Sequence, residues 1–168
     1  DQNFKVVSAQ TAASFWNHDF IHRDVYVLKV KDKSYGKALK EFGKKKGWNF
    51  EVEYSKDASK IKYRKIGNLL VENLEENVIE CIQNWAFADA FATLSENKDK
   101  INLDRLFKES YWKRISKTNV RAKQALEYGF HQMEELGGVE FPHREAKLED
   151  NFVKREIDEA IERVVELG

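Results

Sequence analysis

Two carboxylates close to a group of lysines are the residues of this chain whose spacing comes nearest to metal-assisted chemistry. Glu51 and Glu53 alternate along a strand-like segment, so their side chains share one face. Metal-dependent nucleases hold a divalent ion with such carboxylates and orient the attacking water with a lysine, here Lys60 or Lys62. The acidic residue–x–Lys triplet expected on a strand is missing, and ion pairs of Glu53 with Lys60 and Glu51 with Lys62 explain the same residues. A nuclease is therefore one alternative and not the leading hypothesis.

The histidines offer a second kind of chemistry, metal ligation. His18 and His22 are four residues apart, and His131 and Glu134 are three apart, so each pair fits one face of a helix. A metal ion needs three or four ligands, and the His-Glu-x-x-His zinc motif is absent. We expect surface or capping histidines, no metal site and no cofactor. A site at His18 and His22 stays an alternative for an unrecognised enzyme.

The single thiol, Cys81, is predicted to be a buried structural residue. It lies on an apolar stripe between Val78 and Trp85, whereas a reactive thiol needs an electropositive, accessible setting. A lone cysteine forms no intrachain disulfide and favours a reducing compartment, so we expect a cytoplasmic location. There is no Gly-rich phosphate loop, no Gly-x-Ser-x-Gly elbow and no Cys-x-x-Cys. No motif identifies an enzyme class or a family.

Alternation and turn residues predict mixed strands and helices in the first part of the chain. The segment Val25–Lys31 is apolar on both faces, which is typical of a covered central strand. Trp48–Tyr54 and Ser59–Ile66 are predicted to pair as a hairpin, because that register places opposite charges across from each other. The other elements predicted here are a strand at Phe4–Val7 and helices at Thr11–Phe20 and Tyr35–Lys46.

Apolar residues spaced alternately three and four apart predict helices in the rest of the chain. The longest stripe places Trp85 in the core, and Gly137 and Gly138 end another helix. Seams of this kind predict helices that pack on one another as a bundle. The predicted helices are Leu69–Leu94, Leu103–Ile115, Asn119–Leu136 and Leu148–Leu167.

The stripe on the last helix has two interpretations. Its members are Val153, Ile157, Ala160 and Val164. Each seam spans only two to three heptads, which is short for a free-standing coiled coil, so the first interpretation is a seam of the core. The second interpretation is a helix that docks on a partner protein.

The charges of the chain are balanced in total and segregated along it. From residue 22 to 66 there are fourteen Lys or Arg against six Asp or Glu, and from 67 to 168 fourteen against twenty-one. The basic segment 37–65 could meet a polyanion, although the expected hairpin points Tyr54 and Tyr63 at the core instead of at bases. The candidate polyanion-binding residues are Lys44, Lys45, Lys46, Lys60, Lys62 and Arg64.

These patterns predict an α+β fold in which a small N-terminal sheet with one or two helices packs on a C-terminal bundle of three or four helices. We expect one domain, 1–168, with a basic mixed part (1–66) and an acidic helical part (67–168). Uncharged stretches are short, so no membrane partner is expected. Because the chain starts at Asp1 and its one methionine is Met133, we expect a processed chain or a piece of a larger one.

The leading functional hypothesis is a non-catalytic protein-interaction module with a protein partner. An adaptor, an inhibitor or immunity-type protein, or an excised domain would be of this type. The alternatives are a nucleic-acid-binding domain that uses segment 37–65, and an unrecognised enzyme such as a metal-dependent nuclease. The segregated charge, the strong helices and the lack of catalytic motifs favour the first of the three.

Overall fold

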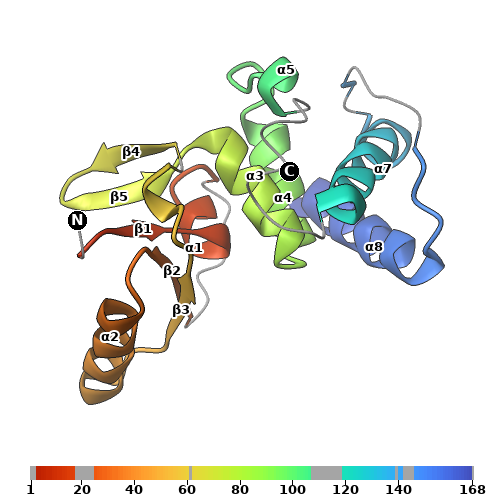
Figure 1. Ribbon diagram of the computed structural model, residues 1–168. Coiled ribbons are helices and arrows are strands. Elements are labelled where there is room, and N and C mark those ends of the chain that lie inside the picture. The colour runs from red at the N-terminus through yellow and green to blue at the C-terminus, as the bar shows by residue number, and fades with distance from the viewer. Residues whose placement is uncertain are drawn as a thin grey trace.

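A five-stranded sheet at one end and a helical bundle at the other make up the structure (Figure 1). It is a computed structural model, which describes residues 3–17, 25–60, 62–106, 119–138, 140–141 and 146–167. The strands fall in the N-terminal half and the helices mostly later in the chain. The predicted α+β class is therefore confirmed. Among the described residues, no helix is both long enough and apolar enough to cross a membrane.

The sheet has the strand order β3-β2-β1-β5-β4. Strand β1 pairs antiparallel with β2 and parallel with β5, β3 is parallel to β2, and β4 is antiparallel to β5. The strands are β1 (Lys5–Val7), β2 (Tyr26–Val30), β3 (Phe50–Tyr54), β4 (Tyr63–Ile66) and β5 (Leu69–Glu72). The sheet part thus runs to Glu72, beyond the change of texture predicted near residue 67.

Helix α2 (Lys33–Lys46) is the crossover between the parallel strands β2 and β3. Asp32 caps its start, because the carboxylate accepts a hydrogen bond from the Tyr35 backbone N–H at 2.9 Å. Gly47, at φ +73°, ends it in the left-handed conformation that glycine adopts without strain. A Cβ on Gly43 would lie 2.9 Å from Cδ2 of Phe50, so the glycine lets the helix lie close to the sheet.

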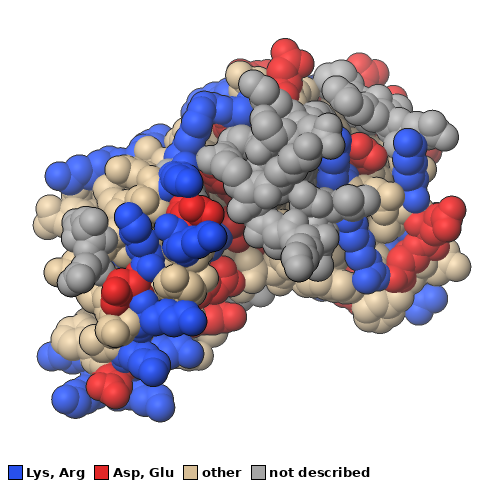
Figure 2. Space-filling view, in the orientation of Figure 1, with Lys and Arg blue, Asp and Glu red and all other residues tan. Residues whose placement is uncertain are grey.

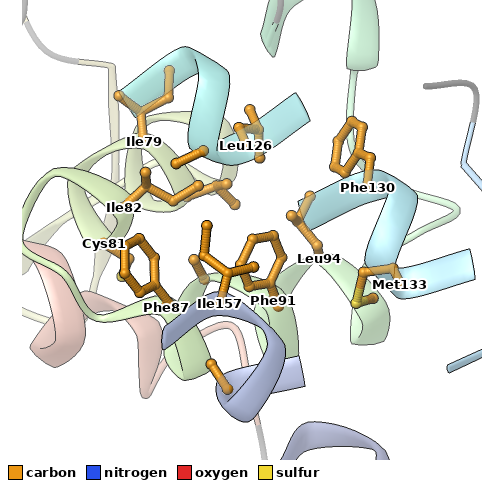
Figure 3. Packing of buried hydrophobic residues seen from close by; sticks show 14 of the residues in the cluster. Ile79, Cys81, Ile82, Phe87, Phe91, Leu94, Leu126, Phe130, Met133 and Ile157 are labelled. Carbon is orange, nitrogen blue, oxygen red and sulfur yellow. The ribbon is translucent and has the colours of Figure 1, made fainter. Parts of the chain in front are cut away.

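The bundle consists of α3, α4, α7 and α8, whose apolar stripes form one core (Figure 3). Figure 3 shows Phe91 and Leu94 directed towards Leu126, Phe130 and Ile157 from the other helices, and all five are buried. Asp150 caps α8 by accepting hydrogen bonds from two backbone N–H groups of its first turn. The helices are α1 (Ala9–Ala13), α3 (Leu74–Gln83), α4 (Phe87–Glu96), α5 (Leu103–Leu106), α7 (Asn119–Gly137) and α8 (Asn151–Leu167).

The predicted hairpin is wrong. Strands β3 and β4 lie at opposite edges of the sheet, with three strands between them. Glu53 lies 4.0 Å from Lys29 on β2, and Lys60 pairs with Asp57 at 3.1 Å in a 3-10 turn (Ala58–Lys60). Cross-strand charge pairs stabilise by about 0.2–1 kcal/mol, which is too little to outweigh a five-residue parallel pair built around a crossover helix.

The predicted single helix Leu69–Leu94 is also wrong. Its first residues form β5, and the rest divides into α3 and α4. Trp85 lies at the break with φ +60° and 49% of its surface exposed, so it is not the core residue that the stripe predicted. Val78 and Cys81 are fully buried as predicted. The prediction of one helix failed because the three- and four-residue spacing of apolar residues continues unchanged across the turn between α3 and α4.

Two further predictions are tested only in part. The helix expected at Thr11–Phe20 is seen as α1 followed by a turn, and the helix expected from Leu103 is seen as α5. Residues 18–20 and 107–115 of these segments lie outside the described residues, as does His22, so the predicted His18 and His22 pair is not described.

Candidate binding site

The two faces of the sheet have opposite character, because side chains alternate along each strand. Val7 pairs with Leu28, and Leu28 with Val52, so these apolar residues share the face that carries α2. Lys29 and Glu53 pair on the other face, which meets α3. The α3 face thus combines buried charged side chains with the buried Val6 and Val27, whereas Val7, Leu28 and Val52 make the α2 face apolar.

The charged face holds a buried ionic network between the sheet and α3. The Lys29 ammonium group contacts the Glu80 carboxylate, and both side chains are almost completely buried. Glu72 accepts hydrogen bonds from Ser8 Oγ at 2.5 Å and from the Ala9 N–H at 3.1 Å. The Lys29–Glu80 contact joins β2 to α3, and the bonds of Glu72 join β5 to Ser8 and the start of α1, so the network fastens the sheet to helices.

Burial and neighbouring charges set the protonation of this network. Complete burial, and then the charge of Glu80, raise the pKa of Glu72 well above its ordinary value, although Lys29 and Ser8 act in the opposite direction. Burial alone would lower the pKa of Lys29, but Glu80 and Glu72 together raise it above 10.5. Ser8, Lys29, Glu72 and Glu80 are all buried and link separate elements, so we assign them a structural role.

The apolar face opens into a pocket of about 480 Å³. Its floor crosses four strands, with Val7 of β1, Leu28 of β2 and Phe50 of β3, and it reaches the rim at Leu69 of β5. Helix α2 and the turn that follows α1 form its walls. The wall residues include Phe15, Leu39, Phe42 and Trp48. A pocket of this size and lining falls in the range that proteins use for ligands or for the side chains of a partner.

The rim of the pocket is apolar and half-exposed. Phe15, Phe42, Trp48 and Leu69 are each 36–47% exposed, although a residue of their size in a monomer would normally be covered further. The rings of Phe42 and Trp48 are 5.8 Å apart and pack edge to face, which holds both at the rim. Several large apolar side chains around one concavity mark an interaction surface.

The charge beside the pocket is positive. Lys5 lines it, and the Lys46 ammonium group lies 5.8 Å from the ring centroid of Phe42. Helix α2 carries six lysines and one glutamate. Figure 2 shows Lys and Arg spread over the sheet end of the molecule, with some Asp and Glu among them. The pocket therefore suits an apolar group with acidic neighbours.

The predicted polyanion-binding residues divide into two groups. Lys44, Lys45 and Lys46 end α2, which packs on β3. Lys60, Lys62 and Arg64 lie in or next to β4, and the Arg64 guanidinium group covers the ring of Trp16 at 4.7 Å. Four strand spacings, about 19 Å, separate the two edges of the sheet. One continuous strip, as the hairpin implied, is therefore not formed, and Tyr54 and Tyr63, predicted to face the core, are 49% and 43% exposed.

The residues predicted for partner docking on the last helix lie inside the molecule. Val153, Ile157 and Ala160 are buried in the bundle core, and Val164 is half-buried. They hold α8 against α4 and α7, which fits the first of the two interpretations.

The predicted enzyme alternatives are not assembled in the described part of the chain. Glu51 and Glu53 lie on the β3 edge and Lys62 beside the β4 edge, so the nuclease arrangement is not formed. His131 and Glu134 share helix α7, and no group of three metal-ligating side chains occurs among the described residues.

Sequence reasoning missed the pocket. No pattern in the sequence sets Phe15, Phe42, Trp48 and Leu69 apart as neighbours on one surface. The signal that could have found it is the strand–helix–strand order of residues 25–54, which indicates a parallel pair with its helix on one face. The chain matches no known family model, no curated protein and no solved structure.

Proposed function

We propose that this protein is a non-catalytic protein-interaction module that binds an apolar segment of a protein partner in the pocket between α2 and the sheet. The observation that carries the proposal is the half-exposed apolar rim of Phe15, Phe42, Trp48 and Leu69 around a pocket of about 480 Å³. Aromatic anchors in and around pockets supply most of the binding energy of protein interfaces.

The chemistry of the rim favours a partner segment with acidic residues beside its apolar anchors. Lys5 and Lys46 flank the apolar surface, and the other lysines of α2 extend the positive field. Such charges speed encounter and select the partner more than they tighten binding, which the apolar anchors provide. A small apolar ligand would use the enclosed floor but would leave the half-exposed rim in water.

A selection from a display library of random short peptides, with the full chain as bait, tests the proposal. We expect the selected peptides to share Trp, Phe or Leu anchors with Asp or Glu next to them. Leu69→Asp places a charge at the pocket rim and should weaken the selected peptides by about tenfold or more. Leu136→Asp is the matched control, because Leu136 is a 39% exposed leucine on α7, away from the pocket.

The response of the selected peptides to the two variants tests the pocket as their binding site. Peptides with acidic flanks that lose binding to Leu69→Asp and keep it to Leu136→Asp support the proposal. Peptides that bind both variants equally, or selected sequences that share no apolar anchor, contradict it.

A second candidate function, nucleic-acid binding, is favoured by the excess of lysine on α2. Fluorescence anisotropy with labelled single- and double-stranded oligonucleotides, at several salt concentrations, tests it. Binding whose log affinity falls linearly with log salt, and which is lost on Lys44→Glu with Lys45→Glu, would support this candidate. Lys62→Glu, next to the opposite sheet edge, is the control, and no binding at low salt removes the candidate.

A further inference from the structure

A pair of exposed aromatic rings projects from the bundle, at the turn between α3 and α4. Trp85 is 49% exposed and Phe152 of α8 is 58% exposed. Their ring centroids are 6.1 Å apart, and the ring centroid of Phe87 lies 5.6 Å from that of Trp85. Trp85 and Phe152 together are called the aromatic knob below. The knob is the convex counterpart of the apolar pocket.

The backbone conformation of Trp85 is strained. Its φ of +60° is a left-handed conformation that only glycine and a few polar residues adopt readily. Burial in the core offsets only part of this strain energy, because half of the residue stays exposed to solvent. Strain at an exposed aromatic residue points to a function for the side chain outside its own core.

Carboxylates outnumber cations in the sequence around Phe152. From residue 149 to 159 the chain has five carboxylates against two cations, whereas four of the five carboxylates between residues 74 and 97 are buried. Exposed Glu149 comes three residues before Phe152, and Arg155 comes three after it. The knob is thus an apolar group with mostly acidic neighbours, which is the chemistry that the pocket and its lysines favour.

The knob has no path into the pocket of its own chain. Helix α3, which ends just before Trp85, packs on the charged face of the sheet through Glu80 and Lys29. The pocket opens on the opposite face, beside α2. An interaction between the two features therefore requires two molecules.

We infer that the partner of the pocket is a second copy of this chain, whose Trp85 and Phe152 insert between α2 and the sheet. This inference rests on the proposed function, because it names the partner of the same pocket. Knob and pocket are different surfaces, so a single knob-in-pocket contact leaves one knob and one pocket free in a dimer, whereas a two-fold dimer would use both pairs. Assembly through single contacts therefore continues past the dimer as concentration rises, unless the rotation closes a ring.

The contact is expected to be weak and sensitive to salt. A stable interface buries about 1,200–2,000 Å², more than two rings in one pocket supply by themselves. The flanking charges are exposed, so salt screens them and should reduce the association.

Sedimentation equilibrium of two complementary variants tests the inference. Wild type should show an average mass that rises with concentration from the 19.7 kDa monomer. Trp85→Gly with Phe152→Ser removes the knob, and glycine suits the φ of +60°. Leu69→Asp blocks the pocket. Each variant alone should remain monomeric, whereas an equimolar mixture should form a one-to-one dimer and nothing larger, because only one intact knob and one intact pocket remain.

Other results would overturn the inference. Wild type that is monomeric up to its solubility limit, or single variants that associate as wild type does, rules out the knob-in-pocket contact. The control variant Leu136→Asp is expected to associate as wild type does. If wild type is monomeric but peptides selected on the pocket still lose binding to Leu69→Asp, the proposed function stands and only the second copy is excluded. If Leu69→Asp affects neither peptides nor self-association, both fail.

Discussion

Lys29 of β2 and Glu80 of α3 form an ion pair that joins the sheet to the bundle, with 10% and 6% of their side chains exposed. Lys29 also lies 4.0 Å from Glu53 and feels the charge of Glu72, so one cation serves three carboxylates. Complete burial, and then the charge of Glu80, raise the pKa of Glu72 well above its ordinary value in spite of Lys29.

Replacement of Lys29 by Met is expected to destabilise the protein by about 3–5 kcal/mol at neutral pH, because it leaves Glu80 buried without its cation. Urea denaturation followed by circular dichroism measures the change. Lys60→Met is the control, since the Lys60–Asp57 pair is exposed and is expected to contribute less than about 1 kcal/mol. Equal losses for the two variants would contradict the structural role assigned to the network.

Glu72→Gln should change how stability depends on pH. The raised pKa means that folded protein holds this proton more tightly than the unfolded chain, whose pKa stays near 4.5. The contribution of Glu72 to the free energy of unfolding is therefore full below pH 4.5 and is lost as the pH rises through the folded pKa.

Glutamine does not titrate, so wild type should lose stability relative to Glu72→Gln as the pH rises from 4.5 into the neutral range. The groups around it are Lys29 from β2, Glu80 from α3 and Ser8 after β1, and all stay in place in the variant. Denaturation curves of both proteins across this range provide the measurement. A difference in the free energy of unfolding between the two proteins that does not change with pH would refute the buried, protonated Glu72.

Trp85→Gly should change stability by no more than about 1 kcal/mol in either direction. Glycine relieves the strain at φ +60°, while the contacts with the Phe87 and Phe152 rings are lost. Phe91→Ala, at a fully buried position of the same bundle, is expected to cost about 3–5 kcal/mol. Thermal melts measure the loss of stability in each variant. If Trp85 were a core residue, Trp85→Gly and Phe91→Ala would lose similar amounts of stability.

Gly129→Ala should destabilise the bundle by about 1–3 kcal/mol, although alanine normally favours a helix interior by about 1 kcal/mol. The added Cβ would lie 2.0 Å from Cζ of Phe91, which is fully buried and has no room to move away. Phe91→Leu in the same chain should recover part of the loss, as a double-mutant cycle would measure. A stabilised Gly129→Ala would show that α7 does not pack this closely on α4.

Helix signals in this sequence were reliable where caps and stripes agreed. Gly138 follows the end of α7 as predicted, Asp32 and Gly47 are of residue types common at helix ends, and the α7 and α8 stripes meet in the core. Their information is local, so residues within a few turns of each other decide the outcome.

Strand partners could not be predicted because they depend on residues far apart in the chain. Glu53 lies next to Lys29, which precedes it in the chain by a whole crossover helix, and not next to the nearby Lys60. The residues of β5 continue the apolar spacing of the helix that follows, so the spacing does not distinguish this strand from a helix. The pocket depends on this topology, since its lining takes one residue or more from each of four strands. Spacing alone gave no sign that Leu69 and Trp48 would share a surface.

The most direct test of the central claim is a methyl NMR titration of the wild-type chain with the tightest peptide from the display selection. The account predicts chemical-shift changes at the pocket methyl groups of Val7, Leu28, Leu39 and Leu69, with Leu136 unchanged. Changes confined to the bundle, with the pocket methyl groups unaffected, would contradict a binding site between α2 and the sheet.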